Sequence, residues 1–176
     1  MMGNRRLTVW ITISLISVLA FLLLRALDRE VARAEQAGFR MVVAQVESVL
    51  AVKTAELVAK DQRNNLKNFV NHNPMDWMNP PPMNYSGIVT EAGSGGASYH
   101  NMAAGHWYFD PQRHLLVYMP ADTQGFVRIA GEVDSFIQFK VTLDFLDRNS
   151  SGAFEQNKDR ILGLKLLRVA GRDTMK

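Results

Sequence analysis

The first pattern in the chain is an uncharged, mostly apolar run from Leu7 to Leu24. Arg5 and Arg6 precede this run and Arg25 follows it. As a helix rising about 1.5 Å per residue, the run would be roughly 27 Å long, close to the hydrocarbon thickness of a bilayer. Because only a helix satisfies all of its backbone polar groups inside lipid, we predict a transmembrane helix over 7–24, preceded by a cytoplasmic tail over 1–6. A helix buried in a soluble core and a cleaved signal peptide are less favoured alternatives, since the apolar region of a signal peptide is normally about 7–15 residues long.

Helical spacing continues beyond the apolar run. No proline occurs before Pro74, and apolar side chains recur every three or four residues. The residues of this apolar stripe are Val31, Ala34, Phe39, Val42, Val46, Val49, Leu50, Leu57, Leu66 and Phe69. We therefore predict an amphipathic extramembrane helix over 25–70, whose stripe needs a cover because a lone helix of this kind is not stable.

Two covers are available for the stripe, namely the chain's own C-terminal domain or another helix in a coiled coil. Lys53 falls near the seam of a heptad pattern, which favours the domain as the cover of the distal part. Nearer the membrane we expect a surface open to a partner, with an oligomer through the helix as one form of it. The candidate residues of this partner-facing surface are Val31, Phe39, Val42 and Val46. The alternative, in which the whole stripe is ordinary intramolecular core, stays open.

Residues 71–104 are rich in proline and glycine and are predicted to form an ordered loop. The segment from Asn71 to Pro74 is expected to end the long helix, because asparagine tolerates a left-handed turn and proline disfavours a helical residue before it. Four aromatic residues in or beside the loop form a candidate binding patch: Trp77, Tyr85, Trp107 and Tyr108. Packing of these rings against the loop is the alternative.

An antiparallel β domain is predicted over 105–176. Two apolar segments flank Asp110-Pro111, which suits a type I turn and hence a hairpin. Apolar and polar residues alternate from Ile137 to Phe145, the pattern of a strand with one buried face. The polar positions expected to face water are Gln138, Lys140, Thr142 and Asp144. Further strands are expected over Phe126–Val133 and around Leu162–Leu166, and four or five strands against the long helix make an α+β fold.

Charge argues against a nucleic-acid partner. The formal net charge is +3, but residues 71–176 contain ten basic and eleven acidic side chains, a net charge of −1, with no basic block to neutralise phosphates. The chain has no cysteine, which excludes disulfides, thiolate catalysis and cysteine-ligated zinc.

Few residues point to metal binding or catalysis. None of the four histidines, which are His72, His100, His106 and His114, has a second histidine three or four residues away. Asp147 opens a segment similar to a calcium loop, but Lys158 stands at the twelfth position, where a bidentate glutamate is required. We therefore expect no metal, no cofactor and no catalytic residues, and a protein that is not an enzyme.

The predicted order of elements resembles the pilin-like proteins of type IV pili and type II secretion systems. Four short segments look like parts of pilus-biogenesis proteins from mannose-sensitive haemagglutinin (MSHA) pilus loci: Asn73–Trp77, Pro80–Gly87, Gly105–Asp110 and Leu116–Tyr118. The layout match covers nearly the whole chain, and the four segments hold 22 residues within 73–118. Pilins are cut after a glycine that precedes phenylalanine, and they carry a glutamate early in the mature helix. Here Asn4 follows Gly3 and the apolar run has no acid, so a processed fibre subunit is not expected.

The resemblance implies a non-enzymatic, single-pass protein of a bacterial inner membrane that assists pilus or secretion assembly through contacts with other assembly proteins. The C-terminal domain would lie in the periplasm. Two alternatives remain, namely a membrane-tethered periplasmic ligand-binding or sensory domain and a minor pilin incorporated in the fibre.

Overall fold

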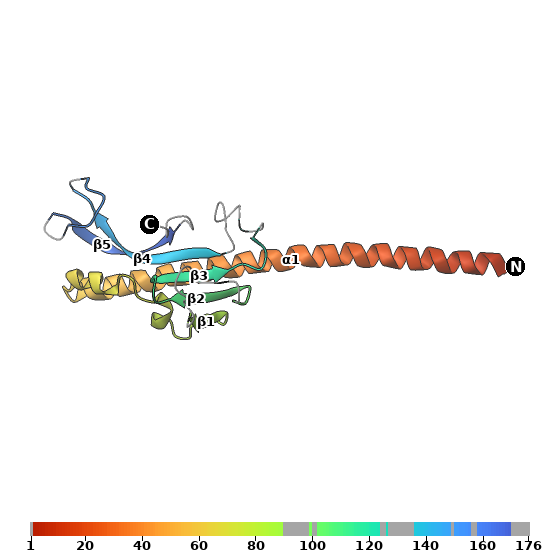
Figure 1. The fold of residues 1–176 in the computed structure, drawn as a ribbon, viewed down its shortest axis with the longest axis horizontal. Helices are drawn as coiled ribbons and strands as arrows, with labels where there is room; N and C mark the ends of the chain where they lie inside the picture. The colour runs from red at the N-terminus through yellow and green to blue at the C-terminus, as the bar shows by residue number, and fades with distance from the viewer. Residues whose placement is uncertain are drawn as a thin grey trace. The chain divides into compact units, whose positions relative to one another are not determined.

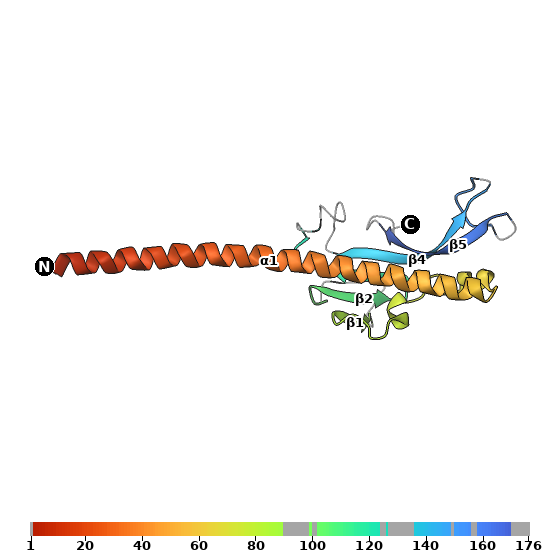
Figure 2. The same cartoon turned by 180° about the vertical axis from the view of Figure 1, so that it is seen from behind.

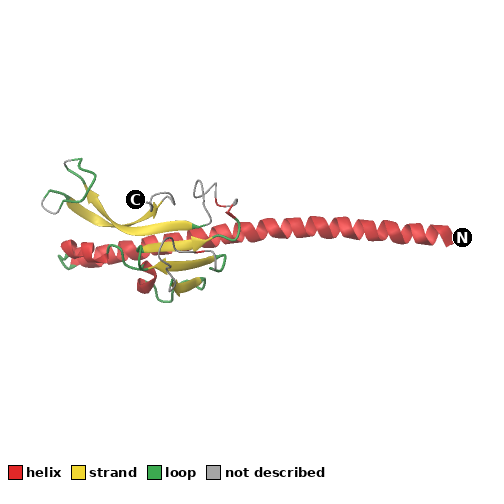
Figure 3. Ribbon diagram, in the orientation of Figure 1, coloured by secondary structure: helices red, strands yellow, loops and turns green. Residues whose placement is uncertain are grey.

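The computed structural model describes residues 2–89, 99, 102–123, 126, 136–148, 150–155 and 158–169, with side chains from residue 9 onwards. The chain divides into two compact units, Met1–Gly38 and Phe39–Lys176. The described part of the first unit is helical, and the described part of the second unit holds the end of the same helix, two short 3₁₀ helices and a five-stranded sheet (Figure 3).

The N-terminal helix α1 extends over Met2–Ala59. In the first unit its apolar side chains are exposed, with Trp10 at 68% and Leu23 at 70%. The Ser17 hydroxyl donates to the Ile13 carbonyl at 2.9 Å, so this polar group is satisfied within the helix. The most apolar window of α1 has a mean hydropathy of 2.2, and the helix is long and apolar enough to cross a membrane.

The helix ends at Ala59, so the prediction of one helix over 25–70 is wrong for its last part. Asp61 adopts the left-handed conformation at φ 56°, and the Gln62 N–H donates to the Leu57 carbonyl. This turn changes the direction of the chain and so allows Leu66 to reach the core, where it is fully buried. Two 3₁₀ helices follow in place of the predicted helix and loop: η1 over Arg63–Phe69 and η2 over Pro74–Trp77.

The sheet has five strands in the order β1-β2-β3-β4-β5. Their bounds are Tyr85–Ile88, His106–Asp110, Leu115–Met119, Ile137–Leu146 and Arg160–Val169. The last four strands pair antiparallel, whereas β1 pairs parallel with β2. The α+β fold of one long helix on a mostly antiparallel sheet is therefore confirmed.

One prediction about strands needs correction, and another lies almost entirely outside the described residues. Strand β1 lies within the segment 71–104, which was expected to be loop throughout. Of the predicted strand Phe126–Val133, the structure describes only Phe126, which is fully buried in the core.

The second half of α1 packs along one face of the sheet; it lies behind the sheet in Figure 1 and in front of it in Figure 2. Phe39 contacts several aromatic rings of this core. Its ring stacks on Trp107 with centroids 5.4 Å apart and planes 7° apart, and it also contacts Tyr118 and Phe126. Leu50 and Leu57, farther along the apolar stripe, are buried in the same core, so the chain's own domain covers the distal part of the stripe, as predicted.

The opposite face of the sheet has a second, smaller core. Its buried members are Val89, Tyr99, Leu115, Val117 and Met119. Because both faces are covered, all five residues of β3 are buried. Gln138 on β4, expected to face water, is only 3% exposed for the same reason.

Strands β4 and β5 form the longest pairing of the sheet, with one irregularity. Phe145 pairs with Ile161 and Asp144 pairs with Gly163, so Leu162 is an extra residue in β5. Leu162 is consequently 47% exposed, although its spacing from Leu164 placed it on the apolar face.

Candidate functional site

The candidate partner-facing residues of the helix do not form one surface. Phe39, Val42 and Val46 are at most 5% exposed, because the sheet of the same chain covers them. The expectation that these three face a partner is therefore wrong, and the alternative of ordinary core holds for them. Val31, in the first unit, is 62% exposed.

The four aromatic residues of the candidate patch are not brought together in one pocket. Trp107 is 0% exposed and packs against α1, while its neighbour Tyr108 packs with the second core on the opposite face of β2. Successive residues of a strand point to opposite faces, so these two rings cannot line the same site. Trp77 contacts the Phe69 ring edge-on at 5.7 Å. Packing, the alternative, accounts for Trp77 and Trp107.

Tyr85 belongs to a small polar cluster that holds η2 against β1. Its hydroxyl accepts a hydrogen bond from Asn73 Nδ2 at 2.9 Å, and the Asn73 side chain also accepts from the Met75 N–H as the N-cap of η2. Burial raises the pKa of Tyr85, the Asn73 hydrogen bond opposes this, and the Asp76 charge adds to it. The cluster orders the loop before β1.

A buried polar pair that the sequence did not indicate lies in the second core. The Tyr99 hydroxyl donates to Asp110 Oδ2 at 2.8 Å, and both residues are at most 2% exposed. The other oxygen of Asp110 accepts from the N–H groups of Gln112 and Arg113. Burial first, and then the Asp110 hydrogen bond and charge, raise the pKa of Tyr99 to about 12. Asp110 thus ends β2, shapes the predicted hairpin turn and anchors Tyr99.

The described histidines have separate local surroundings. His106 Nδ1 lies 2.7 Å from the Ser86 hydroxyl across β1 and β2, an exposed contact that the sequence did not suggest. His72 Nδ1 lies 3.2 Å from the Val70 carbonyl, and His114 has a positive φ of 55° in the β2–β3 turn. His100 lies outside the described residues. Within the described ranges, no group of three or more potential ligands could hold a metal ion.

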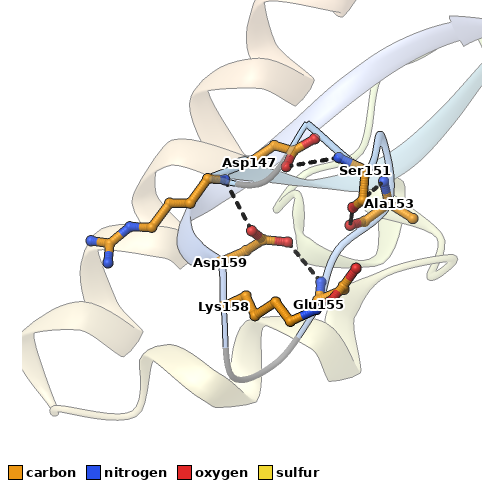
Figure 4. Close-up of polar contacts among 7 residues, drawn as sticks. Asp147, Ser151, Ala153, Glu155, Lys158 and Asp159 are labelled. Atoms are coloured by element: carbon orange, nitrogen blue, oxygen red, sulfur yellow. Dashed lines mark hydrogen bonds and ion pairs between the residues drawn. The ribbon is translucent and has the colours of Figure 1, made fainter.

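The segment similar to a calcium loop joins β4 to β5. Hydrogen bonds from its own backbone N–H groups to its carboxylates hold it in shape (Figure 4). Asp147 accepts from the N–H groups of Ser151 and Gly152 at 3.2 and 2.8 Å. Asp159 accepts from the N–H groups of Arg148 and Glu155 at 3.1 and 2.8 Å. These carboxylates therefore fix the conformation of the β4–β5 loop.

Beside this loop lies a basic pocket of about 280 Å³. Its lining residues are Arg63, Asn64, Arg148, Phe154, Lys158, Asp159, Arg160 and Ile161. They come from η1, the β4–β5 loop and β5, so their approach depends on the fold and could not be read from local spacing. The arrangement can bind a small anionic group.

Comparisons of the chain with protein-family models, with curated proteins and with solved structures found no match.

Proposed function

We propose that the protein is a non-enzymatic, single-pass accessory component of a bacterial inner-membrane assembly, of the MSHA-like type IV pilus or type II secretion kind, and that it acts through protein–protein contacts. The observation that supports this most is the difference between the two parts of α1. Its N-terminal part exposes apolar side chains, and its C-terminal part supplies the core of an α+β domain. This layout is the one on which the pilin resemblance rests.

The exposed apolar side chains of α1 are the reason to place the N-terminal unit in a membrane. Leaving them in water would cost about 25 cal/mol for each Å² of apolar surface, whereas lipid removes that cost. Arg25 lies over the Phe21 ring at 5.1 Å, and a cation at this level suits the headgroup region.

The proposal places the C-terminal unit in the periplasm. A short N-terminal tail with Arg5 and Arg6 suits the cytoplasmic side, although Arg25, Arg29 and Arg33 beyond the span weaken the contrast that the positive-inside rule uses.

A ligand-binding or sensory domain is the second candidate function. Such a domain would use the candidate patch of Trp77, Tyr85 and Trp107 to line a pocket, but Trp107 is completely buried and cannot face a ligand. A minor pilin in the fibre is the third candidate.

Affinity purification from membranes tests the proposal. The full chain, tagged at its C-terminus and extracted in a neutral detergent, should enrich inner-membrane components of a pilus or secretion machine, as identified by mass spectrometry. A matched sample carrying only residues 1–38 and the tag reports contacts made by the membrane helix alone. Enrichment of no assembly component by the full chain would contradict the proposal, and major pilin as the principal partner would favour the fibre subunit.

A further inference from the structure

The basic pocket beside the β4–β5 loop is an unassigned feature of the C-terminal unit. Three elements build it: η1 contributes Arg63, the loop contributes Arg148 and Lys158, and β5 contributes Arg160. Together with Asp159, the lining has four cationic side chains and one anionic side chain, a net charge of +3. This is a local concentration of positive charge in a region that is nearly neutral as a whole.

Most of this positive charge has no carboxylate partner. Lys158 Nζ pairs with Glu155 Oε2 at 2.6 Å, and Arg63 Nη1 donates to the neutral carbonyl of Ile161 at 3.2 Å. Both carboxylate oxygens of Asp159 already accept backbone N–H groups. Among the described residues, neither Arg148 nor Arg160 forms an ion pair within 4.0 Å.

The rest of the lining suits a side chain that has an apolar stem and an anionic head. Phe154 packs edge-on against Phe145 with centroids 5.6 Å apart, and Ile161 is 4% exposed, so the apolar wall is fixed. Guanidinium groups bind carboxylates through paired hydrogen bonds, which makes arginine the preferred partner of such a head. A volume of about 280 Å³ is at the small end for a ligand pocket, which favours one or two side chains over a large cofactor.

We propose that this pocket binds an acidic segment of a partner polypeptide, with Arg148 and Arg160 receiving its carboxylates and Phe154 contacting their aliphatic stems. The inference rests on the proposed function in taking the partner to be a protein. The near-neutral charge of residues 71–176 favours a polypeptide over a nucleic acid, which would need a wider basic surface.

The test uses the full chain in dodecyl maltoside micelles and isothermal titration calorimetry at low salt. An acetylated, amidated hexaglutamate peptide is the probe, and the matching hexaglutamine peptide and inorganic phosphate are the controls. We expect hexaglutamate to bind, and Arg148→Glu and Arg160→Glu each to weaken its binding tenfold or more. Arg168→Glu, an exposed charge reversal outside the pocket on the same strand as Arg160, should weaken it less than threefold.

Several results would overturn the inference. They are absence of hexaglutamate binding, equal binding of hexaglutamine, an equal loss in the Arg168→Glu variant, or phosphate binding as tight as the peptide, which would identify a free-oxyanion site. Circular dichroism of each variant confirms that the fold is retained. Peptide binding at the pocket without any assembly component in the affinity purification would reject the assembly role and leave the pocket standing.

Discussion

Tyr99 is the described side chain whose titration the fold changes most clearly. Its hydroxyl is buried and donates to Asp110, so the native state holds the phenolic proton up to a pH of about 12. In the unfolded chain a tyrosine releases that proton near pH 10. The resulting stabilisation is complete below pH 10 and is lost as the pH rises from about 10 to about 12.

The Tyr99→Phe variant should therefore show a flatter decline of the unfolding free energy between pH 10 and 12 than the unsubstituted chain. Denaturant unfolding at a series of pH values, followed by circular dichroism, measures this difference. Tyr108→Phe serves as a control because it removes a hydroxyl that accepts a hydrogen bond from the Ala103 N–H. Equal slopes for the Tyr99 variant and the unsubstituted chain would show that the fold does not raise the pKa of Tyr99.

Gly163 lies where β5 contacts α1 at Thr54. A Cβ atom there would lie 3.0 Å from Thr54 Cγ2 and 3.2 Å from Thr54 Oγ1. The Thr54 side chain has little freedom to move, since its hydroxyl accepts from the Leu164 N–H at 3.1 Å. Gly163→Ala should cost about 1–3 kcal/mol of unfolding free energy.

The cost of Gly163→Ala should be smaller in a Thr54→Ser background, because serine keeps the hydroxyl and lacks the methyl group. Thermal unfolding of both single variants and the double variant gives the coupling energy. Additive effects would mean that the two residues are not in contact.

At the scale of elements, the second half of α1 has one face in the core and one face exposed, and adjacent residues distinguish the two faces. Val46 is 0% exposed in the core, while Glu47 is exposed. Val46→Asp buries an unpaired carboxylate and should cost roughly 3 kcal/mol or more, whereas Glu47→Asp should cost less than about 1 kcal/mol. Thermal unfolding in detergent measures both, and similar melting temperatures would show that this face of the helix does not pack on the sheet.

The elements that sequence reasoning identified are those with a local signal. The alternation of apolar and polar residues predicted β4, and Asp110-Pro111 predicted the hairpin, because both patterns are complete within a few residues. Strand β1 has four residues and a glycine at φ 93°, and it exists through distant partners such as the Trp107 N–H, which donates to the Asn84 carbonyl. No local pattern reports such a pairing.

The same distinction explains the candidate sites. Phe39 was correctly placed on the stripe, but the sequence could not say whether the cover was the chain itself or a partner. The basic pocket combines Arg63 with Arg148 and Arg160, which are far apart in sequence. Only the fold brings these three residues to one place. Tyr99, which bonds to Asp110, was missed for another reason: it follows a glycine-rich stretch that has no periodic pattern.

For the whole molecule, the orientation in the membrane follows from the proposal. Alkaline phosphatase, which is active only in the periplasm, should be active when it is fused after Gly96 or after Lys176. A cytoplasmic reporter such as β-galactosidase should be inactive at both positions. Cytoplasmic activity at either position would reverse the orientation and remove the pilus assignment.

The central claim is that the protein serves the assembly of a surface machine while anchored in the inner membrane. Deletion of its gene in the organism that encodes it, followed by electron-microscopic counting of surface pili and assay of secreted enzymes, tests that claim most directly. The proposal predicts a loss of pili or of secretion that the full chain restores and that a chain without residues 7–24 does not. Unchanged pili and unchanged secretion in the deletion strain would contradict it.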